Sequence, residues 1–113
     1  MLPRERRLTT REFQDVYQRG SVVPGRFVVL RVLRTEHGPG RWGFAVGQKL
    51  VRDAPSRAKW RRRLRAVVSS MTYGLDDYVL TMRSAGLRAS LPQLHDEIAK
   101  LLDEMPPPSG KTV

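Results

Sequence analysis

Apolar residues near the start of the chain recur with the period of a helix. Phe13, Val16 and Tyr17 are spaced at i, i+3 and i+4, which predicts one apolar helix face. Residues 9–12 read Thr-x-x-Glu, the spacing of a capping box, in which each side chain accepts a backbone N–H of the other residue. We therefore expect a helix that begins within this box and ends at Gly20, with the glycine as a left-handed cap.

Three later segments predict strands because they are short and rich in β-branched and aromatic residues. They are Phe27 to Leu33, Trp42 to Val46 and Asp77 to Met82. Pro24 and Gly25 predict a turn before the first of these strands. We expect the first two strands to pair as a hairpin, although some topologies place another strand between them.

Two further segments have helical periodicity. The first begins at Asp53, a plausible N-cap, with Pro55 in the first turn, and it extends to Ser70. Its apolar stripe consists of Trp60, Leu64, Val67 and Met71, with Val68 at the margin. The second begins at Ser90. Its apolar face consists of Leu91, Leu94, Ile98, Leu101 and Leu102.

This order of elements predicts the fold class. We expect a two-layer α/β (α+β) sandwich, with a small mixed sheet of three or four strands and helices packed largely on one side. A chain of 113 residues is too short for two independent cores, so we expect one domain over residues 1–105. Residues 106–113 begin with three consecutive prolines, and we expect a disordered tail there.

The charge balance points to a polyanionic partner. Lys and Arg number 21 against 11 Asp and Glu, which gives a formal net charge of +10 and a pI near 11.2. Nucleic acid is the leading partner because its phosphates neutralise such a surface, and an anionic membrane surface comes second. Cysteine is absent, which excludes thiolate zinc sites and fits a cytoplasmic protein.

The sequence offers little that could perform catalysis. His37 and His95 lack the neighbours of a catalytic triad, and the acidic pair Asp76 and Asp77 would point to opposite faces of a strand. No glycine-rich phosphate loop occurs either. We expect no catalytic residues and no metal bound by the protein alone.

The second helix is cationic outside its apolar stripe. Residues 57–65 carry six cations in nine positions. Arginine grips phosphate in a planar fork and stacks on bases, so this run favours RNA binding over the alternative of a solvated charged face. Phe13 and Tyr17 are open to two interpretations, core packing or stacking on bases. Together with Arg26 and Phe27, Tyr17 could line a groove for single-stranded nucleic acid.

These segments, in this order, resemble the ribonuclease P protein family over almost the whole folded chain. The resemblance begins with Glu12 through Tyr17 to Gly20 and continues with Arg26-Phe27 and with residues 41–46, Arg-Trp-Gly-Phe-Ala-Val. Its most specific part is the basic run that the family writes K-x-x-x-x-A-V-x-R-N-R-x-K-R-x-x-R. The matching positions here are Lys49, Ala54, Arg57, Ala58, Lys59, Arg61, Arg62 and Arg65. Ala58 replaces the family's asparagine, and Pro55 takes an apolar position.

The resemblance implies a function as well as a fold. It implies a left-handed βαβ crossover and an accessory subunit of ribonuclease P, in which the RNA subunit with Mg²⁺ removes the 5′ leader of precursor tRNA. The residues that would bind the catalytic RNA are Lys49, Arg52, Arg57, Lys59, Arg61, Arg62 and Arg65. The residues of the leader-binding cleft would be Phe13, Tyr17, Arg26 and Phe27.

Two alternatives remain open on the sequence. A general RNA-binding protein of the ribosomal type also needs basic helices and no active site. A divergent family member with weakened processing is motivated by Ala58 and Pro55.

Overall fold

The computed structural model describes residues 7–35, 40–71, 73–74 and 76–104. Its elements, in chain order, are α1 (Thr10–Arg19), β1 (Ser21–Pro24), β2 (Val28–Leu33), β3 (Arg41–Ala45), α2 (Ala54–Ser69), β4 (Asp77–Met82), a short 3-10 helix η2 (Ser84–Arg88) and α3 (Leu91–Asp103). His37 and the expected tail at 106–113 lie outside the described residues. No described helix is long and apolar enough to cross a membrane.

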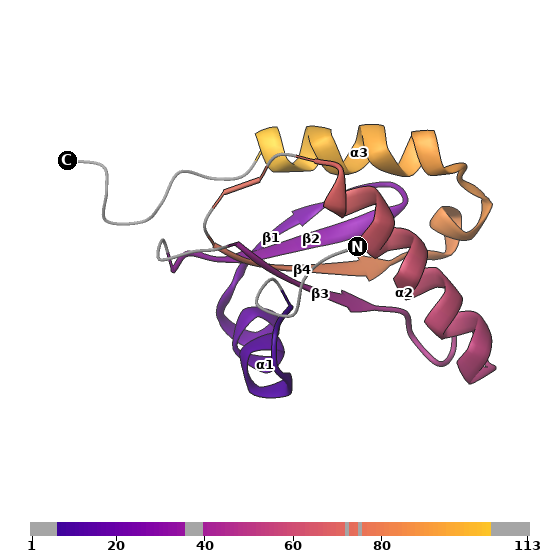
Figure 1. The fold of residues 1–113 in the computed structure, drawn as a ribbon, viewed down its shortest axis with the longest axis horizontal. Helices are drawn as coiled ribbons and strands as arrows, with labels where there is room; N and C mark the ends of the chain where they lie inside the picture. Colours follow the sequence, from indigo (N-terminus) through magenta and orange to yellow (C-terminus); the bar gives the residue numbers. More distant parts are fainter. Residues whose placement is uncertain (1–6, 36–39, 72, 75, 105–113) are drawn as a thin grey trace.

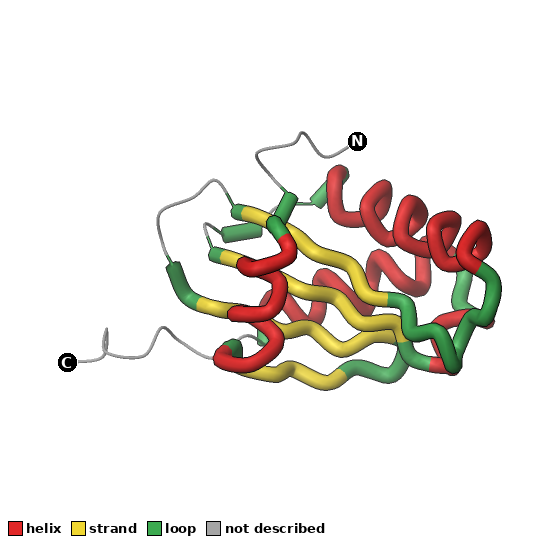
Figure 2. Tube along the Cα trace, turned by 90° about the horizontal axis from the view of Figure 1, so that it is seen from below, coloured by secondary structure: helices red, strands yellow, loops and turns green. Residues whose placement is uncertain are grey.

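The strands form one sheet in the order β1-β2-β4-β3. β4 pairs antiparallel with β2 and parallel with β3, so that Leu80 lies opposite both Leu30 and Phe44. The expected β2-β3 hairpin is therefore wrong, and the alternative topology is confirmed, because β4, the last strand in the sequence, lies between β2 and β3. β3, α2 and β4 form the implied βαβ unit, and Figures 1 and 2 show the left-handed crossover, a hand that such units rarely have.

Helices cover both faces of the sheet. α2 and α3 lie on one face and α1 lies on the other, as the two views in Figures 1 and 2 show. The main core lies between the sheet and the α2-α3 layer, with Trp42, Tyr78 and Leu64 at most 1% exposed. On the other face, Val16 of α1 and Val79 of β4 are fully buried. This second face holds α1 against β2 and β4.

The helix starts agree with the sequence, whereas two details do not. Thr9 and Ser90 cap α1 and α3 in capping boxes, and Asp53 caps α2. Gly20, however, is extended at φ −74°, so it is not a left-handed cap. A Cβ there would lie 2.6 Å from the Val16 carbonyl oxygen, so glycine is needed for close approach. Leu91, expected on the buried face of α3, is 47% exposed because it occupies the first turn.

β1 was not expected from the sequence, which favoured a turn around Pro24. It pairs with β2 through only four residues, and Pro24 is its last. Proline is tolerated there because β1 is an edge strand, where a backbone N–H is not needed for the next ladder.

Candidate nucleic-acid interface

The outer face of α2 is a surface of unpaired cations. Arg62 and Lys59 are exposed, Arg61 is half-buried, and Lys49 and Arg52 are exposed in the segment before the helix. Within the described part of the chain, no carboxylate lies within ion-pair distance of any of them. Cations this close repel one another, so the surface is suited to a partner that brings negative charge.

Arg57 has a different position from the other cations of α2. Its Nη1 donates hydrogen bonds to the carbonyl oxygens of Val51 and Arg52, at 2.9 and 2.6 Å. The side chain therefore braces the loop that leads into α2, and only part of its guanidinium is left for a ligand. The sequence analysis grouped Arg57 with the RNA-binding cations. Its partners are backbone carbonyl oxygens, which every residue has, so no residue type in the sequence indicates this contact.

Arg65 points back from α2 toward the edge strand β3. Its guanidinium carbon lies 5.6 Å from the centre of the Phe44 ring, and its Nε is buried without a hydrogen-bond partner. Burial lowers the pKa of the Arg65 guanidinium, and the charges of Arg7, Arg61 and Arg62 lower it further. A phosphate oxygen would relieve both effects by supplying a hydrogen-bond acceptor and a negative charge.

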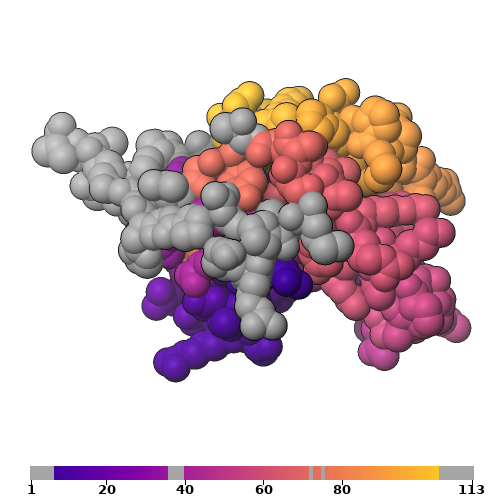
Figure 3. All heavy atoms as spheres, viewed as in Figure 1, coloured from indigo at the N-terminus to yellow at the C-terminus, as the bar shows by residue number. Residues whose placement is uncertain are grey.

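A cavity of about 250 Å³ joins α2 to the start of α1 across β3. Two arginines and three aromatic residues line it together with a leucine, two threonines and a glycine; the full set is Arg7, Leu8, Thr9, Thr10, Phe13, Trp42, Gly43, Phe44 and Arg65. We call it the α1-α2 cavity. Figure 3 shows α1 and the first turns of α2 projecting on either side of a hollow. The cavity thus brings Phe13 of the expected leader site and Arg65 of the expected RNA site into one place.

The aromatic residues of α1 form a nearly flat surface beside this cavity. The rings of Phe13 and Tyr17 have centres 6.2 Å apart and planes inclined by 11°. Tyr17 is 48% exposed, and the Arg31 guanidinium lies over its ring at 4.2 Å. Stacked rings and an arginine plane are groups on which unpaired bases stack. Exposure of Tyr17 favours the stacking interpretation over core packing for that residue.

α1 is held in place by a network of charged groups on the sheet. Asp77 of β4 receives two hydrogen bonds from Arg41, at 2.9 and 3.0 Å, and Arg41 also contacts the Glu12 carboxylate. The backbone N–H of Thr9 and the Arg41 guanidinium lower the pKa of Glu12. Asp76 is held separately by Arg34 at 2.9 Å. These carboxylates are therefore structural partners of arginines.

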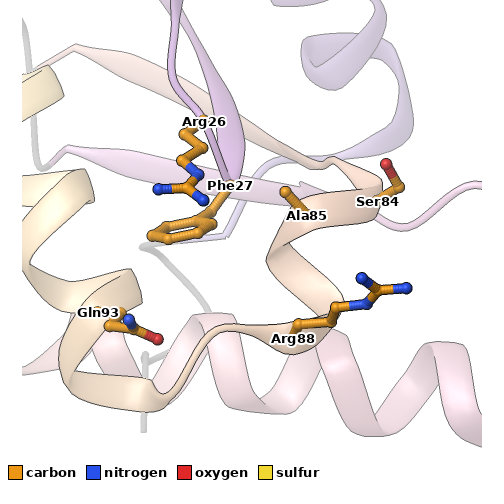
Figure 4. A pocket seen from close by; sticks show the side chains of 6 residues that line it. All are labelled: Arg26, Phe27, Ser84, Ala85, Arg88 and Gln93. Carbon is orange, nitrogen blue, oxygen red and sulfur yellow. The ribbon is translucent and has the colours of Figure 1, made fainter.

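Arg26 and Phe27 do not lie with Phe13 and Tyr17. They line a different cavity, together with residues of η2 and α3, which is drawn in Figure 4. Phe27 packs against the α2-α3 core, because it precedes β2 and turns toward α3. The structure thus separates the four residues expected in one cleft into two pairs.

Three contributors to the α1 side were not expected as site residues, although the resemblance includes Arg41 and Gly43. Arg31 and Arg41 alternate with buried residues in β2 and β3, and Gly43 leaves room for the Phe13 ring. The alternation of arginine with apolar residues was the available signal, since it places each arginine on the face of the strand opposite to the buried residues. No cluster of three or more metal-ligating side chains occurs among the described residues.

Comparisons with known proteins agree with this fold. A Thermotoga maritima RNase P protein structure superposes with a TM-score of 0.77 at 20% identity, covering 88% of this chain and 97% of that one. The Staphylococcus aureus RNase P protein gives a TM-score of 0.73 at 23% identity, with coverages of 88% and 94%. At these identities the likeness concerns the fold alone.

Sequence comparisons establish the family. The ribonuclease P protein component of Pseudanabaena sp. (strain PCC 6903) is 29% identical over 107 residues, which cover 90% of this chain and 92% of the relative. That of Xanthomonas euvesicatoria pv. vesicatoria (strain 85-10) is 37% identical over 71 residues, covering 61% and 49%. The sequence profile named Ribonuclease P matches residues 2–106. The chain therefore belongs to the ribonuclease P protein family, the accessory subunits of an endoribonuclease of tRNA 5′ processing.

Proposed function

We propose that this protein binds the catalytic RNA through the outer face of α2 and the 5′ leader of precursor tRNA through the aromatic surface of α1. The observation that carries this proposal is the α1-α2 cavity, where Phe13 and Arg65 line one hollow. A single-stranded RNA segment that leaves the folded RNA at α2 would reach the stacking groups at α1 along this cavity, whose lining contains no acidic residue. The protein would thus raise affinity and position the substrate.

In this proposal the bond is broken by the RNA subunit with its Mg²⁺. The carboxylates nearest the cavity, Glu12 and Asp77, are already bound by Arg41, so they are poor ligands for an additional cation. Mg²⁺ prefers carboxylates, phosphates and water that are free to coordinate it. We therefore assign the metal ions to the RNA. We also propose that the protein works in the cytoplasm, which fits its cysteine-free sequence.

The first test compares two charge reversals on exposed residues. Arg62→Glu on α2 should weaken binding to ribonuclease P RNA by about tenfold or more at moderate salt. It should also flatten the dependence of log K on log salt by about 0.7 to 0.9 for each lost phosphate contact. Lys100→Glu is the matched control, because it makes the same charge change near the end of α3. Equal losses in the two variants would mean that only total charge matters, and would contradict an interface on α2.

A leader series separates this proposal from general RNA binding. Precursor tRNAs with leaders of increasing length should bind the assembled enzyme more tightly until the α1 surface is filled, and then no further. Affinity that is independent of leader length would favour the ribosomal type of RNA-binding protein. A folded protein that fails to stimulate cleavage at low Mg²⁺ would instead indicate a divergent member with weakened processing.

A further inference from the structure

A second cavity, of about 440 Å³, lies at the N-terminal end of β2. Its walls come from three separate segments: Arg26 and Phe27 before β2, Ser84, Ala85 and Arg88 of η2, and Gln93 of α3. In Figure 4 the side chains of Arg26, Phe27 and Gln93 lie on one side of the hollow and those of Ser84 and Arg88 on the other. The volume falls in the range of roughly 300 to 1,000 Å³ typical of small-molecule sites. We call it the Arg26-Arg88 cavity.

The backbone around this cavity is fixed by one carboxylate. Glu97 of α3 accepts hydrogen bonds from the backbone N–H groups of Arg26, Phe27 and Val28, at 2.7 to 2.9 Å. The Arg83 side chain adds a hydrogen bond of 2.9 Å to the Gly25 carbonyl oxygen. Both Glu97 oxygens are therefore used to hold the loop, and the cavity is preorganised.

The polar side chains of the cavity offer donors. Gln93 Oε1 accepts the Ser90 backbone N–H at 2.8 Å in the capping box of α3, which leaves the Gln93 NH₂ group available to donate. Arg26 and Arg88 are exposed and have no carboxylate partner within the described residues. None of the six lining residues is acidic. Such a site selects a ligand rich in acceptors and negative charge.

Phe27 adds a stacking surface to these donors. Its ring is partly buried against the core, and the Arg26 guanidinium lies 5.4 Å from the ring centre. An aromatic face bounded by two arginines and an amide combines the groups that recognise a base with those that hold its phosphate.

We propose that the Arg26-Arg88 cavity binds a single unpaired nucleotide of RNA. The base lies against Phe27 and receives a hydrogen bond from the Gln93 amide, while Arg26 and Arg88 hold the phosphate. This site shares no residue with the α1-α2 cavity. The inference rests on the proposed function in that RNA is the partner, but it assigns a second contact point that the α1 and α2 surfaces do not include.

The first experiment uses the intact protein and a mononucleotide. In NMR spectra of the ¹⁵N-labelled chain, uridine 5′-monophosphate should shift the backbone amides of Ser84, Ala85 and Gln93 in a saturable manner. Inorganic phosphate should bind there about tenfold more weakly, since base stacking is absent. Equal affinity for the two probes would reduce the cavity to an anion site and overturn the proposal.

Gln93→Glu is the most informative variant. Glutamate also serves in a capping box, so the Ser90 cap is preserved, but the donor NH₂ becomes a negative oxygen. Uridine 5′-monophosphate should bind about tenfold more weakly to this variant and to Arg88→Ala. Lys100→Ala, which removes one exposed cation from the last turn of α3, away from the cavity, is the control and should bind as wild type does. Unchanged binding to Gln93→Glu and Arg88→Ala would overturn the proposal.

The source of the nucleotide is distinguished in the assembled enzyme. 4-Thiouridine placed either in the catalytic RNA or in the leader should cross-link to the peptide containing Ser84 to Arg88 in only one of the two cases, and that case names the source. Absence of cross-links from both, with Arg62→Glu still impairing assembly, would refute this site while leaving the proposed function intact. If Arg62→Glu is also without effect, the proposed function fails as well.

Discussion

Gly43 in β3 decides where the Phe13 ring lies. A Cβ at this position would be 2.6 Å from the Phe13 Cδ2 atom, which is too close for the ring to stay where it is. Gly43→Ala should therefore displace the ring, cost about 1 to 3 kcal/mol of unfolding free energy, and weaken binding of leader-bearing precursor tRNA by about tenfold. Denaturant unfolding and binding to precursor and leaderless tRNA measure these effects.

Gly47→Ala is the matched control for this substitution. No atom lies within 4 Å of a Cβ at Gly47, so the unfolding free energy should change by less than about 0.5 kcal/mol. If Gly43→Ala lost as much affinity for leaderless tRNA as for leader-bearing precursor tRNA, Phe13 would not act through the leader.

At this scale the sequence identified residue types but not their partners. It placed Arg57, Arg62 and Arg65 in one group of RNA-binding cations. The structure gives them three environments: a brace on the Val51 and Arg52 carbonyls, an exposed surface, and a partly buried position beside Phe44. Since helical spacing fixes only the direction of a side chain, the groups it meets on other elements could not be predicted.

At the scale of elements, α1 is coupled to pH through Glu12. Its pKa in the folded protein lies below the usual value of 4.5, chiefly because the Thr9 backbone N–H stabilises the carboxylate. A lowered pKa means that the unfolded chain binds more protons, so stability rises with pH. The contribution of Glu12 is complete above about pH 4.5 and is lost as pH falls through its folded pKa.

Glu12→Gln tests this coupling. Glutamine preserves the capping box but neither titrates nor carries charge toward Arg41, so we expect a loss of about 1 kcal/mol at neutral pH. The unfolding free energy should also fall less steeply between pH 5 and pH 3 than in wild type, as urea titrations at each pH would measure. Asp53, whose pKa is also lowered, leaves some dependence in the variant. An identical slope in both proteins would contradict the role of Glu12, and Asp96→Asn at an exposed carboxylate supplies the control.

Local signals predicted most elements but not their arrangement. The N-caps of α1, α2 and α3 and the bounds of β4 follow from contiguous residues, and all were confirmed. The position of β4 between β2 and β3 depends on contacts between residues such as Phe44 and Leu80, which are far apart in the chain. β1 has too few residues to show an alternating pattern, so its pairing with β2 could not be predicted either.

On the scale of the whole molecule, the carboxylates that pair with arginines and the surplus cations of α2 occupy different regions. Asp76 pairs with Arg34, and Asp77 and Glu12 pair with Arg41, whereas the cations of α2 have no carboxylate partners among the described residues. With a net charge of +10, the folded chain concentrates repulsion on one helix, and any anion that binds there favours folding.

Multivalent anions should therefore stabilise the free protein specifically. A sulfate site filled at ten times its Kd adds about 1.4 kcal/mol, which corresponds to roughly 6 °C in Tm for a domain of this size. Thermal unfolding in sodium sulfate and in sodium chloride of equal ionic strength measures the difference in Tm between the two salts. Arg65→Ala should reduce this difference, because Arg65 has an unpaired Nε and three cationic neighbours. At the same ionic strength chloride screens as well as sulfate does, but it cannot bridge several guanidinium groups. Equal stabilisation by both salts would therefore mean that screening alone relieves the repulsion.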